Sequence, residues 1–185
     1  MKPVERSELL DYVTYDEQRP TLRPLAIAAK AARRVEVGGG TFTFLFENRD
    51  TVRYQVQEMM RTERIVREAD IQHELHTYNE LLGGPGELGC TLLIGIDDEA
   101  ERARKLVEWL ALPERVYLEL ADGTRVRPRF DPRQVGEGRL SSVQYLKFAA
   151  PRQPVAVGVE LDGMQARTEL SEEQRAALAE DLAAP

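Results

Sequence analysis

The pattern of hydrophobic positions is most regular between residues 46 and 82, where it predicts two consecutive helices. At about 100° of turn per residue, one apolar stripe follows the first helix and comprises Val52, Val56, Met59, Met60 and Val66. A second stripe, in a helix from about Asp70 to Leu82, comprises Ile71, Leu75, Tyr78 and Leu82. We expect both stripes to face the core and the rest of the chain to be organised around this helical pair.

Glu63 falls in the middle of the first stripe, so we expect its side chain to point inward. A carboxylate among apolar neighbours must be paired or hydrogen-bonded, because burying it alone costs on the order of several kcal/mol. Arg67 follows Glu63 at i+4 and Arg61 follows Glu58 at i+3, so local ion pairs can satisfy both carboxylates. Two interpretations stay open, a structural ion-pair network and a binding site.

Alternation with a period of two predicts strands in other parts of the chain. Phe42, Phe44 and Phe46 share one face of a strand over 41–47, which forms a hairpin with 34–37. The apolar runs 90–96 and 142–148 predict two interior strands. Further hairpins are predicted at Asp122-Gly123 and Asp162-Gly163, from strands 116–120 with 125–129 and 155–161 with 165–170.

Helix signals place four more helices along the chain. Ser7 starts a short one, and another runs from Pro20 to Arg33 with Pro24 in its first turn. Its apolar side comprises Leu22, Leu25, Ala26, Ala29 and Ala32. Asp97 or Asp98 caps a helix over 99–110, and Ser171 with Gln174 forms a capping box that starts a terminal helix. The chain is thus predicted to be one α+β domain over 1–185, with a mixed, mostly antiparallel sheet built from hairpins and helices packed on it.

Composition and charge exclude several classes of protein. The net charge of −7 argues against general nucleic-acid binding, which depends on neutralising phosphates. No window approaches the roughly 18 apolar residues that a membrane span requires, so we expect a soluble, cytoplasmic protein. Cys90 is the one cysteine, which rules out an internal disulfide, and its apolar strand predicts a buried, unreactive thiol.

The chain lacks the residue patterns of the common catalytic and cofactor sites. There is no nucleophile elbow, no phosphate-binding loop, no dinucleotide fingerprint and no HExxH metal motif, and no cofactor is identifiable. His73, His76 and Glu80 lie together on the second helix and outline a metal site without a fourth ligand, for which a solvated polar face is the alternative. Whether the protein is an enzyme stays open.

Carboxylates, amides and arginines are concentrated on the helical pair and at its entrance. They form a candidate binding cluster that comprises Glu47, Arg49, Gln55, Gln57, Glu58, Arg61, Glu63, Glu74 and Asn79. Groups of these types recognise small polar ligands when they converge on a pocket, and they form ion-pair networks when they do not.

The segments FENRDTVRYQVQEMMRTERI and IQHELHTYNELL, with SSVQYLKF near the C-terminus, resemble a bacterial domain-of-unknown-function family, number 3501. The matching positions are Phe46, Glu47, Arg49, Gln55, Gln57, Glu58, Met59, Arg61, Glu63, Ile65, Gln72, Glu74, Leu75, Tyr78 and Asn79. Genes of this family often lie beside those of rubrerythrin-like proteins and iron–sulfur oxidoreductases. The resemblance therefore implies a cytoplasmic role in peroxide defence or electron transfer.

Three functions follow from these observations. The first is an accessory protein that docks to a rubrerythrin-like or iron–sulfur partner through the helical pair. The second is an enzyme or small-ligand binder that uses the candidate binding cluster. The third is a structural homo-oligomer in which a buried polar network fixes the register.

Overall fold

A computed structural model describes residues 1–184, with eight strands, six α-helices and two short 3₁₀ helices in that range. The helices are η1 (Arg6–Glu8), α1 (Tyr12–Ala31), α2 (Arg49–Glu63), α3 (Glu68–Asn79), α4 (Glu99–Glu108), α5 (Leu112–Arg115), η2 (Pro132–Gln134) and α6 (Glu172–Ala183). The strands are β1 (Arg34–Val37), β2 (Phe42–Glu47), β3 (Glu87–Ile94), β4 (Val116–Leu120), β5 (Arg125–Val126), β6 (Val143–Ala149), β7 (Pro154–Leu161) and β8 (Met164–Glu169). The predicted α+β class is confirmed.

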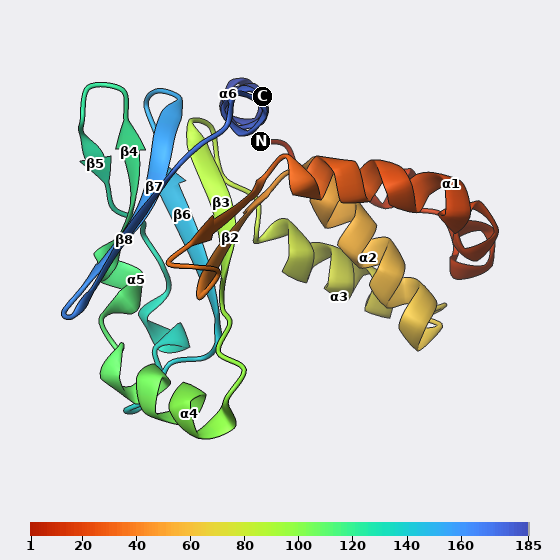
Figure 1. Ribbon diagram of the computed structural model, residues 1–185. Helices are drawn as coiled ribbons and strands as arrows, with labels where there is room; N and C mark the ends of the chain where they lie inside the picture. Colours follow the sequence, from red (N-terminus) through yellow and green to blue (C-terminus); the bar gives the residue numbers. More distant parts are fainter. Residues whose placement is uncertain (185) are drawn as a thin grey trace.

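The strands form two four-stranded antiparallel sheets, where the sequence predicted a single sheet. Sheet A has the order β1-β2-β3-β6 and sheet B the order β5-β4-β7-β8. Figure 1 shows the two sheets next to each other, with α1, α2 and α3 beyond sheet A. Helix α6 lies at one end of the sheets, and α4 and α5 lie at the other. The prediction of a single sheet was wrong, because hairpin signals show which neighbouring strands pair but not which hairpins share a sheet.

The main hydrophobic core lies between the two sheets. The alternation of β2 directs Phe42, Phe44 and Phe46 into this core, where all three are buried. Val116 and Leu118 of β4 reach it from sheet B. Strand β3 lies between β2 and β6, so the predicted interior strand at 90–96 is confirmed. Its Cys90 is buried opposite Phe46, as the apolar run predicted.

Strand β6 lies at the edge of sheet A, and the prediction of an interior strand at 142–148 is wrong. One of its faces packs on the core through Leu146 and Phe148, but Tyr145 on the other face is 52% exposed. An isolated bridge between Arg129 and Lys147 covers part of the free edge. Apolar residues on both faces of a strand indicate that each face can pack against other residues, but they do not show whether the strand lies at the centre or the edge of its sheet.

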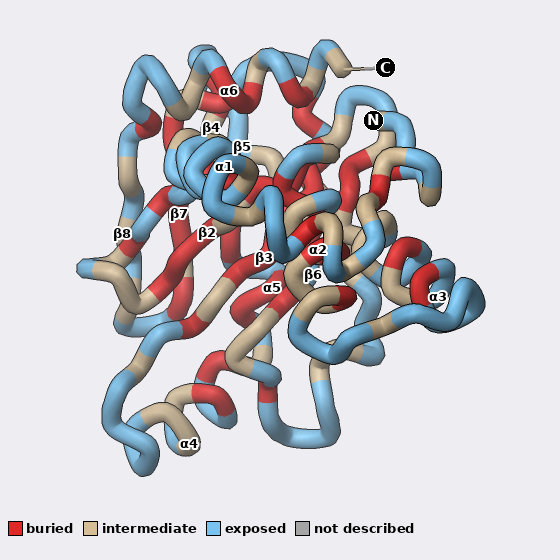
Figure 2. Tube along the Cα trace, turned by 90° about the vertical axis from the view of Figure 1, so that its right-hand side faces the viewer, coloured by how far each residue is buried: buried red, intermediate tan, exposed pale blue. Residues whose placement is uncertain are grey.

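A second hydrophobic cluster stabilises the helices. Helices α2 and α3 form a helical hairpin that connects β2 to its sheet neighbour β3 along the chain. Figure 2 shows these two helices with α1 in front of sheet A. The cluster comprises Val4, Leu9, Val52, Val56, Met60, Ile71, Leu75 and Leu82. Most of the predicted stripe residues are therefore buried. Val66 is an exception at 69% exposure, because α2 ends at Glu63 and Arg64 adopts a left-handed conformation with φ of 53°.

Helix α1 begins eight residues before the predicted start at Pro20. Asp11 caps it by accepting hydrogen bonds from the backbone N–H groups of Val13 and Thr14, and the helix then continues through Pro20 and Pro24. Both prolines are exposed, so the carbonyls that lack a helical donor can be hydrated. The prediction of Pro24 in the first turn was therefore wrong. No helix within residues 1–184, α1 included, is long and apolar enough to cross a membrane.

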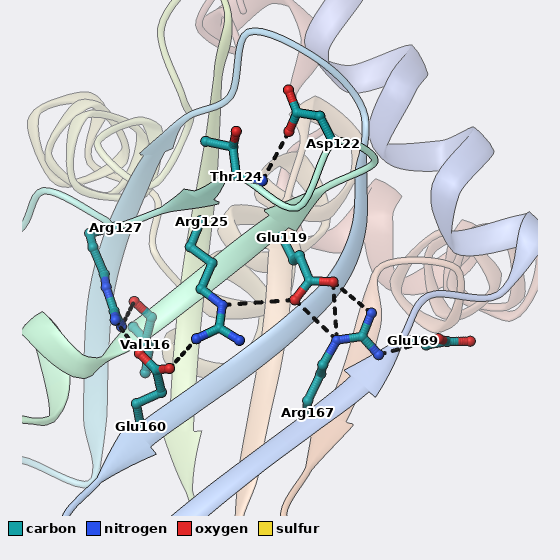
Figure 3. A network of polar contacts seen from close by, with 9 residues as sticks. All are labelled: Val116, Glu119, Asp122, Thr124, Arg125, Arg127, Glu160, Arg167 and Glu169. Atoms are coloured by element: carbon teal, nitrogen blue, oxygen red, sulfur yellow. Dashed lines mark hydrogen bonds and ion pairs between the residues drawn. The ribbon is translucent and has the colours of Figure 1, made fainter.

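The outer face of sheet B carries a network of ion pairs between arginines and glutamates (Figure 3). The Arg167 guanidinium donates to Glu119 at 2.7 Å, and Arg125 and Arg127 both pair with Glu160. The Tyr117 ring, 2% exposed, lies beneath Arg125 at 4.4 Å from ring centre to guanidinium carbon. It also lies against Gly158, its partner on β7, where an added Cβ would be 2.2 Å from the ring. These charges satisfy one another, which is typical of a solvated sheet face.

Candidate functional site

Two amides of the candidate binding cluster bind the backbone of the N-terminal segment, residues 1–10. The Asn79 amide nitrogen donates to the Val4 carbonyl at 2.9 Å, and its oxygen accepts from the Val4 N–H at 2.8 Å. Gln57 makes the same pair of bonds with Leu10, at 3.0 Å and 2.7 Å. Each amide satisfies one donor and one acceptor of the segment, as a neighbouring strand would.

Arg49 holds the same segment through its guanidinium. One nitrogen donates to both carboxylate oxygens of Glu8 at 2.7 Å, and another donates to the carbonyls of Lys2, at 2.8 Å, and Pro3. Together with the two amides, Arg49 keeps Val4 and Leu9 in the hydrophobic cluster of the helices. The structure therefore gives Arg49, Gln57 and Asn79 intramolecular partners.

Glu58 and Arg61 bind α1 to α2. Glu58 accepts from the Tyr15 hydroxyl and from Arg19 Nε, both at 2.7 Å, and Arg61 pairs with Asp16. Burial opposes the charged form of Glu58, but the hydrogen bonds from Arg19 and Tyr15 outweigh it and lower the pKa of this carboxyl. Glu58 thus has a partner from α1 rather than the predicted local partner Arg61.

Glu47, at the end of β2, is a buried carboxylate with a complete set of donors. Its side chain is 4% exposed and accepts from Thr51 Oγ1 at 2.5 Å, Gln55 Nε2 at 3.2 Å and Thr91 Oγ1 at 3.0 Å. These bonds connect the first turns of α2 to β3. They account for both Glu47 and Gln55 of the candidate binding cluster.

The expectation that Glu63 points inward is wrong. Glu63 is exposed at the last position of α2, and it makes no hydrogen bond or ion pair with any residue in 1–184. Because the helix ends there, the chain turns back and the Ile65 N–H donates to the Met60 carbonyl at 2.9 Å, so that Ile65 covers the cluster instead. Glu74 is half-buried and likewise has no polar partner in the described part of the chain.

The outlined metal site on α3 does not assemble. His73 and His76 are exposed, and His76 Nε2 lies 3.4 Å from Glu80. Among residues 1–184, no three His, Cys, Asp or Glu side chains are placed to hold a metal ion. This face of α3 is a solvated polar surface.

The structure shows a feature that the predicted cluster did not include, a groove between α1 and α2 with a volume of about 410 Å³. Helix α1 contributes Leu22, Leu25, Ala26 and Ala29, and α2 contributes Asp50, Arg53, Tyr54 and Gln57. Both sets follow the spacing i, i+3, i+4, i+7 of a single helix face. The sequence did predict the apolar side of α1, but not that Leu25 would stay 68% exposed.

Three places are therefore candidates for a functional site: the bonds to the N-terminal segment, the buried Glu47 and the groove between α1 and α2. The first two consist of satisfied intramolecular pairs. Of these three places, only the groove combines open volume with an exposed apolar side chain, Leu25.

Comparisons with known proteins agree with this fold. A crystal structure of a novel protein of unknown function from Burkholderia pseudomallei is similar, with a TM-score of 0.88 and 26% sequence identity. The match covers 98% of this chain and 100% of that one. No curated protein matches the chain significantly. The model of the family described as Protein of unknown function (DUF3501) matches residues 3–182, and the chain therefore belongs to that family.

Proposed function

We propose that this protein is an accessory protein that binds a helix of a protein partner in the groove between α1 and α2. The observation that carries the proposal is Leu25 of α1, which lines the groove beside the half-buried Leu22 and Ala29 and is itself 68% exposed. A partner from redox or peroxide metabolism, either rubrerythrin-like or an iron–sulfur protein, is the class that the family resemblance supports.

The shape of the groove favours a helical occupant. Two helices that each present an i, i+3, i+4, i+7 face to the same space form two sides of a helical bundle without its third member. From Tyr15 to Ala29 the seat is about 21 Å long at 1.5 Å per residue, enough for roughly four helical turns. The small, half-buried side chain of Ala29 leaves room for a larger apolar side chain from the partner.

The charges at one end of the groove are balanced. Glu8 pairs with Arg49 at 2.7 Å, and Asp50 pairs with Arg53 at 2.8 Å. The apolar lining of the groove, rather than a net charge, therefore sets the chemistry of the proposed partner helix.

A binding role is also favoured over catalysis because most residues of the candidate binding cluster form intramolecular bonds. Arg49, Gln57 and Asn79 are used to hold the N-terminal segment, and Glu58 and Arg61 to hold α1. These groups do not converge on the groove as a set, whereas an enzyme that used them would need them free and facing a substrate.

The test compares two substitutions on the same helix. Leu25→Asp places a charge in the groove, and Ile27→Asp places one at an exposed position of α1 outside it, 44% exposed in the parent. Affinity for the purified rubrerythrin-like protein of the same organism is measured by calorimetry, after circular dichroism has shown that both variants are folded. We expect Leu25→Asp to weaken binding about tenfold or more and Ile27→Asp to leave it unchanged.

Equal effects of the two substitutions, or no binding by the parent protein, would overturn the proposal. Sedimentation velocity covers the homo-oligomer alternative. If the parent is a dimer and Leu25→Asp makes it a monomer, the groove holds a second copy of this chain and the proposed partner is wrong.

A further inference from the structure

A cleft at the same end of the sheets as α4 lies apart from the groove and from the candidate binding cluster (Figure 1). It consists of two adjoining hollows of about 310 and 300 Å³, and Lys105, Trp109 and Asp162 border both of them. Lys105 belongs to α4, and Asp162 lies in the turn between β7 and β8. Small-molecule sites start at about 300 Å³, so each hollow is large enough to hold part of a ligand.

Trp109, which follows the last residue of α4, is the most constrained side chain of the cleft. It is 6% exposed, and its ring lies 5.2 Å from the Phe42 ring and 5.1 Å from Lys105 Nζ. Its indole N–H makes no hydrogen bond with any residue in 1–184, although a buried indole normally finds an acceptor. In that range only Gln144 Oε1 is both fully enclosed and unpaired, so the Trp109 N–H stays in contact with the cleft as a donor of fixed position.

Three charged side chains of the cleft have no ion pair or side-chain hydrogen bond within residues 1–184. Asp162 borders both hollows, Glu101 borders the larger one, and Arg115 borders the smaller one. Lys105 differs from them, because it pairs with Glu108 at 3.1 Å. The cleft therefore presents two free carboxylates and one free guanidinium, which leaves an excess of negative charge.

We propose that this cleft binds a free basic amino acid such as lysine. Trp109 and Arg115 border the same hollow, where both can donate hydrogen bonds to a carboxylate. Asp162 lies in the wall of that hollow too and accepts from the α-ammonium group. An α-amino acid carries both of these charged groups on one carbon atom, so a single ligand satisfies the free donors and the free acceptor.

The larger hollow fits the side chain of a basic amino acid. Ile96 and Met164 provide apolar contacts for an alkyl stem, and Glu101 provides a carboxylate for a terminal cation. A basic amino acid is a net cation near pH 7, which complements the excess negative charge of the free groups. An acidic amino acid would instead be repelled by Glu101 and Asp162.

The fluorescence of Trp109 tests the proposal, because Trp109 is the one tryptophan of the chain. The full-length protein is titrated with L-lysine, cadaverine and Nα-acetyl-lysine at constant ionic strength, and calorimetry detects any binding that leaves the emission unchanged. We expect L-lysine to bind with a Kd below about 1 mM. Cadaverine lacks the carboxylate and Nα-acetyl-lysine lacks the α-ammonium, so each should bind about tenfold or more weakly.

Two substitutions with the same change of net charge separate the site from its surroundings. Asp162→Asn removes the proposed partner of the α-ammonium and should weaken L-lysine binding about tenfold or more. Glu114→Gln is the control, since Glu114 is exposed next to Arg115 but does not border the cleft, and the Kd should stay the same. Arg115→Gln should weaken the binding of L-lysine but not that of cadaverine, which has no carboxylate.

The proposal is wrong if neither method detects binding of L-lysine, or if cadaverine binds as tightly as L-lysine. Equal effects of Glu114→Gln and Asp162→Asn would also overturn it, because the overall charge would then explain the affinity. Leu25→Asp, in the groove between α1 and α2, should bind L-lysine like the parent protein. The result is therefore separate from any failure of the groove to bind a helix.

Discussion

At the scale of single residues, the strongest structural pair is Arg33 with Asp181. Its two hydrogen bonds measure 2.7 Å and 2.9 Å, and both side chains are less than 10% exposed. Asn48, the cap of α2, also donates to Asp181 at 3.4 Å. This pair joins the C-terminal helix to the end of α1 and the start of α2.

We predict that Asp181→Ala destabilises the protein by about 3–5 kcal/mol, because it leaves the Arg33 guanidinium buried without its counter-charge. Urea denaturation followed by circular dichroism measures the change. Glu36→Ala is the matched control, since it breaks the exposed pair of Glu36 with Arg34 and should cost about 0–1 kcal/mol. Similar losses for both variants would contradict the structural role of the buried pair.

For Glu63 we predict almost no effect on stability. Its carboxylate is exposed and has no partner in the described chain, so Glu63→Gln and Glu63→Ala should each change the free energy of unfolding by less than about 0.5 kcal/mol. The same urea titrations provide the measurement. A loss of several kcal/mol would mean that Glu63 is buried after all.

Cys90 is predicted to react slowly with thiol reagents in the folded protein. It is buried in β3, and that burial raises the pKa of its thiol well above the usual value, so little thiolate is present or accessible. Labelling with a chromogenic disulfide should be slower than for free cysteine by a factor of ~100 or more, because the strand must first open. Addition of urea should remove the difference, and rapid native labelling would show the prediction to be wrong.

At the scale of elements, the N-terminal segment is attached by side chains rather than by a strand ladder. Asn79→Ala removes both bonds to Val4 and should reduce stability by about 1–3 kcal/mol, since a buried donor and acceptor lose their partners. Hydrogen exchange should rise in residues 1–10 and stay unchanged in β3. Thr77→Ala, which removes an exposed hydroxyl that bonds only the His73 carbonyl within α3, is the control and should leave the exchange of this segment as it was.

Local sequence signals predicted the elements whose causes are local. The alternation of Phe42, Phe44 and Phe46 places β2 correctly, and the capping box of Ser171 with Gln174 marks the start of α6. Asn79 and Val4 are 75 positions apart, and no local pattern connects them. The start of α1 was missed because two prolines carry a strong stop signal, which solvent exposure of that helix face overrides.

At the scale of the molecule, the same limit applies to the candidate binding cluster. The sequence placed its nine polar residues on one helical pair and at the entrance of that pair, but their function depends on which other segments reach them. The N-terminal segment and α1 take up five of these residues, and the groove lies between α1 and α2. The charged face of sheet B is a further feature that only the pairing of β4 with β7, and of β7 with β8, brings together.

Acid should destabilise the whole molecule. Hydrogen bonds from Arg129, Arg167 and Arg127 lower the pKa values of Glu87, Glu119 and Glu160 from their usual 4.5. A carboxyl whose folded pKa lies below its unfolded one stabilises the fold above about pH 4.5 and loses that contribution as pH falls through the folded value. We expect the melting temperature to fall between pH 5 and pH 3, and less steeply in Glu160→Gln. A melting temperature independent of pH in this range would contradict these pairings.

The most direct test of the proposed helix-binding groove is to observe it while the partner binds. Methyl groups of Leu22, Leu25, Ala26 and Ala29 are followed by NMR during titration with the purified rubrerythrin-like protein. The proposed function predicts that these resonances shift or broaden together at the stoichiometry of binding, whereas Val157 in the core between the sheets stays unchanged. Binding that perturbs the outer face of sheet B and leaves the four α1 residues unaffected would contradict it.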